Sequence, residues 1–220
     1  WDAMAACDAL LLVTPAQHLR ATLQTLPRSD AILILCCKGI EAESRMLMSE
    51  VAAELRPDNP LAVLSGPTFA HEVAQGLPTA LTLACESEDL WDRLNPLIAK
   101  TGFRPYYSDD VVGAEIGGAV KNVLAIGCGV VDGAGLGQNA RASLISRGFA
   151  EMLRYGEARG ASAETLSGLC GLGDLVLTCT STQSRNYSLG VALGEGRALD
   201  EILGERNSVA EGVYTAGGKP

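Results

Sequence analysis

The chain has 220 residues, of which 47% are hydrophobic and 20% are charged, and its formal net charge at pH 7 is −9. This composition is typical of a globular protein with one large or two small domains, and the negative charge argues against a nucleic acid or an anionic membrane surface as a partner. The seven cysteines include no C-x-x-C pair, and there are only two histidines, so the sequence predicts free thiols in a reducing cytoplasm, no disulfide framework and no metal site.

Short apolar runs alternate with helical patterns in the first half of the chain. Strands are predicted at 9–14, 31–37, 61–65, 79–85 and 103–107, and helices at 17–26, 41–55 and 89–101. This alternation predicts a doubly wound, parallel, Rossmann-like sheet in an α/β domain, which we expect to span residues 1–112. Because the chain opens at Trp1, close to a buried strand and without a methionine, we expect this domain to be N-terminally truncated.

The pattern becomes helical beyond about residue 112. Long helices are predicted at 115–131 and 140–159, and shorter ones at 163–169, 185–193 and 199–203. Residues 113–220 are therefore expected to form an all-helical second domain. No apolar run is expected to reach the length of a membrane span, so no integral membrane segment is predicted.

Lys121 is the one charged residue between positions 116 and 131. A buried ammonium is costly unless it is paired or its pKa falls, so this lysine is a candidate acid–base group with a lowered pKa. The alternative is a lysine whose stem lies along the apolar surface while its ammonium reaches water. Asp174, in a glycine-rich apolar stretch, is either a turn residue or the partner of Lys121.

Glycine, lysine and hydroxyl residues follow three of the predicted strands, at Thr14-Pro15, at Lys38-Gly39 and at Ser65-Gly66-Pro67-Thr68. Ligands of open α/β sheets bind at the carboxyl ends of the strands. Each segment alone is typical of an ordinary turn, but three that meet at one edge favour a pocket.

A candidate anion site lies in the second half of the chain. Ser184 is predicted to be the N-cap of the following helix, and the exposed amides there, with Arg185 and Asn186, suit a phosphate or a carboxylate. The alternative is an ordinary capped helix with a solvated arginine. The P-loop, H-E-x-x-H, G-x-S-x-G and G-x-G-x-x-G patterns are not found in the expected contexts, and neither His18 nor His71 has the surroundings of a catalytic triad.

Six short motifs follow one another along the chain: Lys38-Gly39-Ile40-Glu41, Ser65-Gly66-Pro67-Thr68-Phe69-Ala70, Gly118-Ala119-Val120-Lys121-Asn122, Gly171-Leu172-Gly173-Asp174-Leu175, Ser184-Arg185-Asn186 and Glu211-Gly212. In order and spacing they closely resemble the bacterial NAD(P)-dependent glycerol-3-phosphate dehydrogenase family, over essentially the whole chain. The resemblance implies a cytoplasmic oxidoreductase that reversibly reduces dihydroxyacetone phosphate to sn-glycerol 3-phosphate, for glycerophospholipid synthesis. It implies NADP or NAD as cofactor and a small-molecule phosphate as substrate, and it leaves open whether the protein is a homodimer.

The resemblance also implies roles for individual residues. Lys121 matches the catalytic lysine, which also contacts the substrate. The other implied substrate-binding residues are Lys38, Gly66, Thr68, Asp174, Ser184, Arg185 and Asn186. The implied cofactor-binding residues are Lys38, Ala70, Arg185, Val209 and Glu211. Relative to the family, we expect the chain to lack the opening βαβ unit with its glycine-rich phosphate loop and to end before the last helices, and therefore to bind the cofactor weakly.

Two other functions are compatible with the residues alone. One is another two-domain dehydrogenase with a helix lysine, acting on a hydroxy acid whose carboxylate would replace the phosphate at Arg185. The other is a non-catalytic nucleotide-sensing module, which would not need Lys121, Asp174 and Arg185 together.

Overall fold

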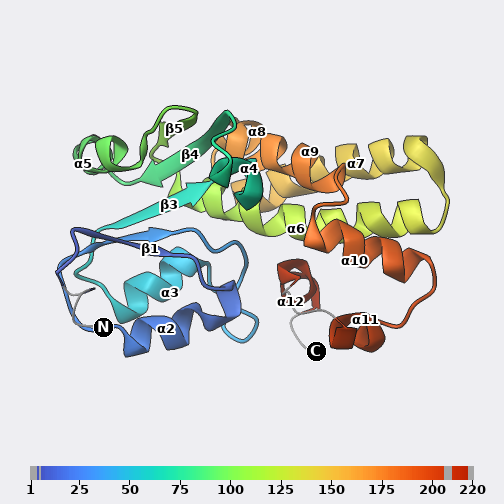
Figure 1. Cartoon of the computed structure of the whole chain (residues 1–220), viewed down its shortest axis with the longest axis horizontal. Helices are drawn as coiled ribbons and strands as arrows, with labels where there is room; N and C mark the ends of the chain where they lie inside the picture. The colour runs from blue at the N-terminus through green and yellow to red at the C-terminus, as the bar shows by residue number, and fades with distance from the viewer. Residues whose placement is uncertain (1–3, 5, 206–209, 218–220) are drawn as a thin grey trace.

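A five-stranded sheet is followed by a long helical region in the computed structural model, which describes residues 4, 6–205 and 210–217 (Figure 1). The strands are β1 (Ala9–Leu12), β2 (Ile32–Leu35), β3 (Leu61–Ser65), β4 (Thr79–Cys85) and β5 (Phe103–Ser108), and they lie side by side in that order. Among the helices of this part are η1 (Ala16–His18), α2 (Leu19–Thr25), α3 (Met48–Leu55) and α5 (Glu88–Ile98). The predicted Rossmann-like α/β fold with a helical second part is confirmed.

The sheet is mixed, however, and not parallel throughout as predicted. β1, β2 and β3 are parallel and β4 is parallel to β5, but β4 runs antiparallel to β3. The connection between β3 and β4 holds the five-residue helix α4 (Ala70–Ala74). A helix of that length spans about 7 Å, too little to carry the chain back along the sheet for a parallel pairing. The chain therefore turns back at the same end of the sheet.

Strand β2 is buried on both faces, with all four of its side chains at most 3% exposed. Leu33 and Leu35 pack with α2 and α3 on one face, and Ile32 and Ile34 pack with α5 on the other. Helices on both faces explain why the strands read as continuous apolar runs.

The predicted helix at 41–55 begins only at Met48, as α3. Before it, the backbone hydrogen bond from Glu41 N to Met46 O closes a turn, and Arg45 has a φ of 63°. A right-handed helix cannot pass through that conformation. Glu41 is held in the turn by Arg20, whose Nε donates to it at 2.9 Å.

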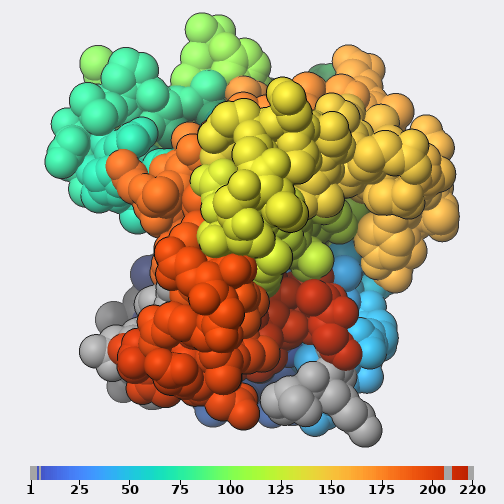
Figure 2. Space-filling view, turned by 90° about the vertical axis from the view of Figure 1, so that its right-hand side faces the viewer, coloured from blue at the N-terminus to red at the C-terminus, as the bar shows by residue number. Residues whose placement is uncertain are grey.

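The helical part is built around α6 (Val111–Gly133). The helices α7 (Gly137–Ala158), α9 (Asp174–Cys179), α10 (Arg185–Gly194) and α12 (Glu211–Gly217) pack against it. The short helix α8 (Ala163–Ser167), the π-helical segment η2 (Leu169–Gly173) and α11 (Leu199–Glu205) complete the described residues of this part. Figure 2 shows α10 and α11 in orange-red beneath the yellow end of α7.

Glycines bring α6 and α10 into direct backbone contact. Gly129 and Gly133 of α6 face Gly190 and Gly194 of α10, and a Cβ added to Gly190 would lie 2.1 Å from the carbonyl oxygen of Ile126. Only glycine permits this approach, so the G-x-x-x-G spacing on both helices fixes how they lie against each other.

By length and apolar composition α6 could cross a membrane, so the expectation that no apolar run reaches that length was wrong. Most of α6 is buried within the protein, however, against α7, α9, α10 and α12. Its apolar character is explained by this central position.

Candidate functional site

A cleft of about 570 Å³ lies where the carboxyl ends of β1 and β2 face α6, α10 and α12. The predicted site residues that line it are Lys38, Thr68, Lys121, Ser184, Arg185, Asn186 and Glu211. Gly66 and Ala70 line a smaller adjoining pocket of about 280 Å³, which also contacts Lys38 and Thr68. Val209 lies outside the described residues.

Asp174 joins two lysines that come from opposite sides of the cleft. Lys121 Nζ, on α6, donates to Asp174 Oδ1 at 2.6 Å, and Lys38 Nζ, after β2, donates to Asp174 Oδ2 at 2.5 Å. Asp174 is 1% exposed and Lys121 is 7% exposed. Lys121 is therefore a buried, paired lysine, and of the two interpretations of Asp174 the structure shows the one in which it is the partner of Lys121.

Burial and the neighbouring charge of Lys38 together lower the pKa of Lys121 to about 8, against the opposing effect of Asp174. For Asp174, burial disfavours the charged form, but the two lysines outweigh it and hold its pKa below the ordinary value. The cluster therefore combines a permanent carboxylate with an ammonium able to exchange its proton near neutral pH.

Thr178 is a further member of this cluster that the sequence interpretation missed. Its Oγ1 accepts a hydrogen bond from Lys121 Nζ at 3.1 Å and donates to Asp174 Oδ1 at 3.2 Å. Its position four residues after Asp174, on the same face of α9, is the signal that could have identified it.

Glycines in η2 set the position of Asp174. A Cβ on Gly171 would lie 1.9 Å from the carbonyl oxygen of Leu166, and one on Gly117 of α6 would lie 2.4 Å from that of Cys170. The η2 backbone therefore packs directly on α6, and α9 begins with Asp174 beside Lys121. π-Helical turns of this kind are frequent at functional sites.

The loop after β3 positions Lys38. Its Nζ donates to the carbonyl oxygen of Gly66 at 3.0 Å, and Thr68 Oγ1 donates to the same oxygen at 3.4 Å. Gly66 packs so closely on Leu81 that a Cβ there would be 2.7 Å from the leucine Cβ. Glycine is thus required at this strand end for steric reasons.

The first turn of α10 carries the predicted anion-binding residues. Ser184 Oγ accepts from the backbone N–H of Tyr187 at 3.2 Å, which confirms it as the N-cap. Asn186 Nδ2 donates to Asn122 Oδ1 on α6, and Asn186 Oδ1 accepts from the N–H of Gly212 on α12, both at 3.0 Å. The Asn186 amide thus joins three helices at the wall of the cleft, beside Arg185.

Glu211 connects α12 to the sheet part of the molecule. Its Oε1 accepts from the backbone N–H of Ala16, after β1, at 3.2 Å. Burial raises the pKa of Glu211, against the opposing charges of Arg185 and His18. The carboxylate therefore lies at the edge of the cleft between the two parts of the molecule.

Within residues 4, 6–205 and 210–217, three buried side-chain oxygens have no hydrogen-bond partner: Thr14 Oγ1, Ser65 Oγ and Glu211 Oε2. Thr14 and Glu211 line the cleft, and Ser65 lines the adjoining pocket. Buried polar atoms are normally satisfied, so this grouping suits a polar ligand.

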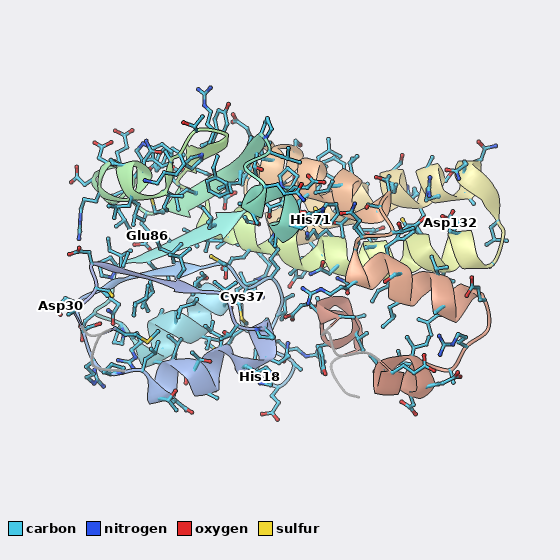
Figure 3. All side chains as sticks on the ribbon, in the orientation of Figure 1. His18, Asp30, Cys37, His71, Glu86 and Asp132 are labelled. Atoms are coloured by element: carbon cyan, nitrogen blue, oxygen red, sulfur yellow. The ribbon has the colours of Figure 1, made fainter. Side chains whose placement is uncertain are left out.

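Figure 3 shows His18 at η1 and His71 on α4, while Cys37 lies at the end of β2. The side chain of His71 is 52% exposed and lies 3.9 Å from Glu72. In the described part of the chain, no group of three His, Cys, Asp or Glu side chains could hold a metal ion.

The chain resembles known proteins over its whole length. Residues 1–91 match the family profile described as NAD-dependent glycerol-3-phosphate dehydrogenase N-terminus, and residues 110–218 match the corresponding C-terminus profile. The chain is 69% identical over 213 residues to a glycerol-3-phosphate dehydrogenase (NAD(P)+) of Erythrobacter litoralis, covering 97% of this chain and 64% of that protein. A similar enzyme of Novosphingobium aromaticivorans is 64% identical over 214 residues, with coverages of 97% and 65%.

A crystal structure of glycerol-3-phosphate dehydrogenase from Coxiella burnetii superposes with a TM-score of 0.93 at 40% identity, covering 99% of this chain and 67% of that one. The chain thus spans a little under two thirds of the length of the two relatives named above. The two profiles, the identities and the superposition all indicate the family that the sequence motifs resemble. The chain belongs to the NAD-dependent glycerol-3-phosphate dehydrogenase family.

Proposed function

We propose that the protein is a cytoplasmic enzyme that reversibly reduces dihydroxyacetone phosphate to sn-glycerol 3-phosphate with NADH or NADPH, for glycerophospholipid synthesis. The observation that carries this proposal is the Lys38–Asp174–Lys121 cluster, which lies in the same cleft as Arg185. In this proposal, residues 1–112 bind the dinucleotide and residues 113–220 bind the substrate.

Lys121 is the proposed acid–base group. Reduction of a ketone places negative charge on the carbonyl oxygen and requires a proton there. The Lys121 ammonium stabilises that charge and donates the proton, and in the reverse direction the neutral amine takes it back. A pKa of about 8 suits both directions near neutral pH. Asp174 and Thr178 hold the ammonium in place, each through a hydrogen bond.

Arg185 and the first turn of α10 are proposed to bind the phosphate. A guanidinium binds phosphate through paired hydrogen bonds, and the amides of a capped helix N-terminus favour an anion. Gly66, Thr68, Ser184 and Asn186 complete the proposed substrate site. Fixing the phosphate end orients the carbonyl toward Lys121 and Lys38, which lowers the entropic part of the barrier.

The described residues fit a dinucleotide at the ends of β1 and β2. Thr14 and Glu211 line the cleft, and Thr14 Oγ1 and Glu211 Oε2 have no hydrogen-bond partner among the described residues, which suits a polar ligand nearby. Lys38, Ala70, Arg185 and Glu211 are the proposed contacts, with Val209 proposed from the family resemblance alone. The cofactor, when bound, supplies the hydride.

The test is the oxidation of NADH or NADPH by the purified full-length protein, followed by absorbance. We expect turnover with dihydroxyacetone phosphate and little with 2-keto acids, because the cleft presents an arginine and a helix N-terminus to a phosphate. Faster turnover of a 2-keto acid would favour the hydroxy-acid dehydrogenase instead. Cofactor binding without turnover of either class would favour a nucleotide-sensing module.

A further inference from the structure

Glu115 is a buried carboxylate outside the proposed reaction site. It lies in the second turn of α6 and is 5% exposed. Its Oε1 accepts from the backbone N–H of Ser49 at 2.8 Å, and its Oε2 accepts from the Ser49 hydroxyl. Burying a carboxylate destabilises the folded protein unless its contacts compensate, so the contacts of Glu115 indicate what it does.

Through these contacts Glu115 caps a helix to which it does not belong. Ser49 is in the first turn of α3, whose N-cap is Leu47, a residue with no side-chain acceptor. Glu50 satisfies the Leu47 N–H from within α3, at 2.6 Å. The Ser49 N–H is satisfied from α6, so the start of α3 depends on the helical part of the molecule.

This contact also fixes the loop that carries Lys38. The loop 36–47 joins β2 to α3, and the bridge between Ile40 and Leu47 closes it upon itself. Leu47 packs in the same apolar cluster as Ile116, the residue that follows Glu115. The far end of the loop is therefore attached to α6 at Glu115 and Ile116.

The loop after β2 and the helix α6 each carry a lysine that bonds to the Asp174 carboxylate. Lys38, near the start of the loop, and Lys121, six residues after Glu115 on α6, both bond to Asp174. Six residues of helix span about 9 Å, with little freedom along the axis. The attachment at Ser49 therefore sets how far the Lys38 loop lies from Lys121.

We propose that Glu115 is a positioning residue for the reaction proposed above: by capping α3 from α6, it fixes the loop that carries Lys38 in register with Lys121. This inference rests on the proposed function. The groups that face Glu115 include the backbone N–H of Met48, Ser49 and Glu50 of α3, and Cys37 after β2.

The test compares three variants of the full-length protein. Glu115→Ala removes both hydrogen bonds, and we expect kcat for dihydroxyacetone phosphate to fall about tenfold while KM changes less, because the phosphate contacts at α10 are unaffected. Glu115→Gln keeps an acceptor for the Ser49 N–H and a donor for its hydroxyl, so it should retain kcat within about twofold. Arg159→Met breaks the exposed ion pair between Arg159, the C-cap of α7, and Glu50 on α3, and is the matched control, expected to behave as wild type.

Hydrogen exchange gives a readout that does not depend on turnover. Amides in residues 36–47 should exchange faster in Glu115→Ala than in Glu115→Gln. If Glu115→Ala does not fold, Ser49→Ala, which removes only the hydroxyl donor, replaces it with the same expected direction. A Glu115→Ala protein of reduced stability but unchanged kcat and unchanged exchange in the loop would overturn the inference, whereas a wild-type protein inactive on dihydroxyacetone phosphate would overturn only the proposed function.

Discussion

Lys121 is the residue on which the proposed chemistry depends most directly. Lys121→Met should lower kcat by at least about 10²-fold, the smaller end of the range for a general acid–base group. Stability should be retained, because Asp174 keeps its hydrogen bond to Lys38 when Lys121 is lost. Steady-state kinetics and thermal unfolding check both expectations. A variant with near-normal turnover would exclude the acid–base role.

The pKa of Lys121 predicts the direction of the pH dependence. Reduction needs the ammonium, so its rate should decline as pH rises through about 8, while oxidation of glycerol 3-phosphate, which needs the neutral amine, should increase over the same range. Rate profiles in the two directions measure this. Two profiles that change in the same direction would show that another group controls the rate.

Arg185 is a second single residue that tests the proposal, through its effect on substrate binding. Arg185→Ala should raise the KM for dihydroxyacetone phosphate about tenfold or more, because charge-assisted hydrogen bonds to the phosphate are lost. The KM for a phosphate-free analogue should change much less. Equal increases for both substrates would indicate a structural arginine.

At the scale of elements, the direct contact between α6 and α10 is the feature most sensitive to substitution. Gly190→Ala places a methyl group 2.1 Å from a backbone oxygen of α6, so α10 must shift. We expect a loss of about 2 kcal/mol in the free energy of unfolding, as for other overpacked cores, together with weaker substrate binding.

The matched control for this change is Gly204→Ala, in α11. Nothing lies within 4 Å of a Cβ at that position. Alanine there should stabilise the protein by about 0.5 kcal/mol, since it restricts the unfolded chain more than glycine does. Chemical denaturation of both variants would separate the effect of the α6–α10 contact from that of helix propensity. Equal changes in the free energy of unfolding would contradict a destabilising role of the contact at Gly190.

Elements decided by local sequence could be predicted, and those decided by distant contacts could not. The apolar run at 61–65 and the Ser184 cap need only their neighbours, and both agree with the structure. The late start of α3 depends on Arg20, which holds Glu41 from another helix. The direction of β4 depends on how far α4 can carry the chain, which no apolar pattern records.

The site shows the same division. Lys121 could be singled out in the sequence because a single charge interrupts an apolar helix. For Asp174, pairing with Lys121 was one of the two interpretations that its surroundings left open. Lys38 and Asp174 are separated by 136 positions, so their contact follows from the fold. Thr178 lies one helical turn from Asp174, but its contact with Lys121 forms only when α9 packs on α6, and the contact of Glu115 with Ser49 forms only when α6 packs on α3.

At the scale of the whole molecule, Glu115 couples stability to pH. Burial raises its pKa to about 7, against the lowering effect of Ser49. The folded protein therefore holds a proton that the unfolded chain releases at lower pH, so the free energy of unfolding falls as pH rises from about 4.5 to about 7. Above about pH 7, where the carboxylate is ionised, this effect lowers the free energy of unfolding by about 3 kcal/mol relative to its value below about pH 4.5.

Glu115→Gln should remove this part of the pH dependence and make the protein more stable at pH 8 than the wild type. Denaturation across the pH range measures it. Glu86→Gln, at an exposed glutamate, is the control and should leave the dependence as it is. A wild-type dependence that persists in Glu115→Gln would mean that other groups produce it.

The close contact of α6 with α10 has a consequence for the geometry of the cleft. The backbones of the two helices touch through Gly129, Gly133, Gly190 and Gly194, which leaves little room for one helix to shift relative to the other. Lys121 lies on α6 and Arg185 on α10, so this contact sets the distance between the proposed acid–base group and the proposed phosphate-binding group. Hydrogen bonds at Asp174, Glu211 and Glu115 join the helical part to the α/β part of the molecule. Lys38 is held at the same site from the sheet side, through its hydrogen bond to Asp174.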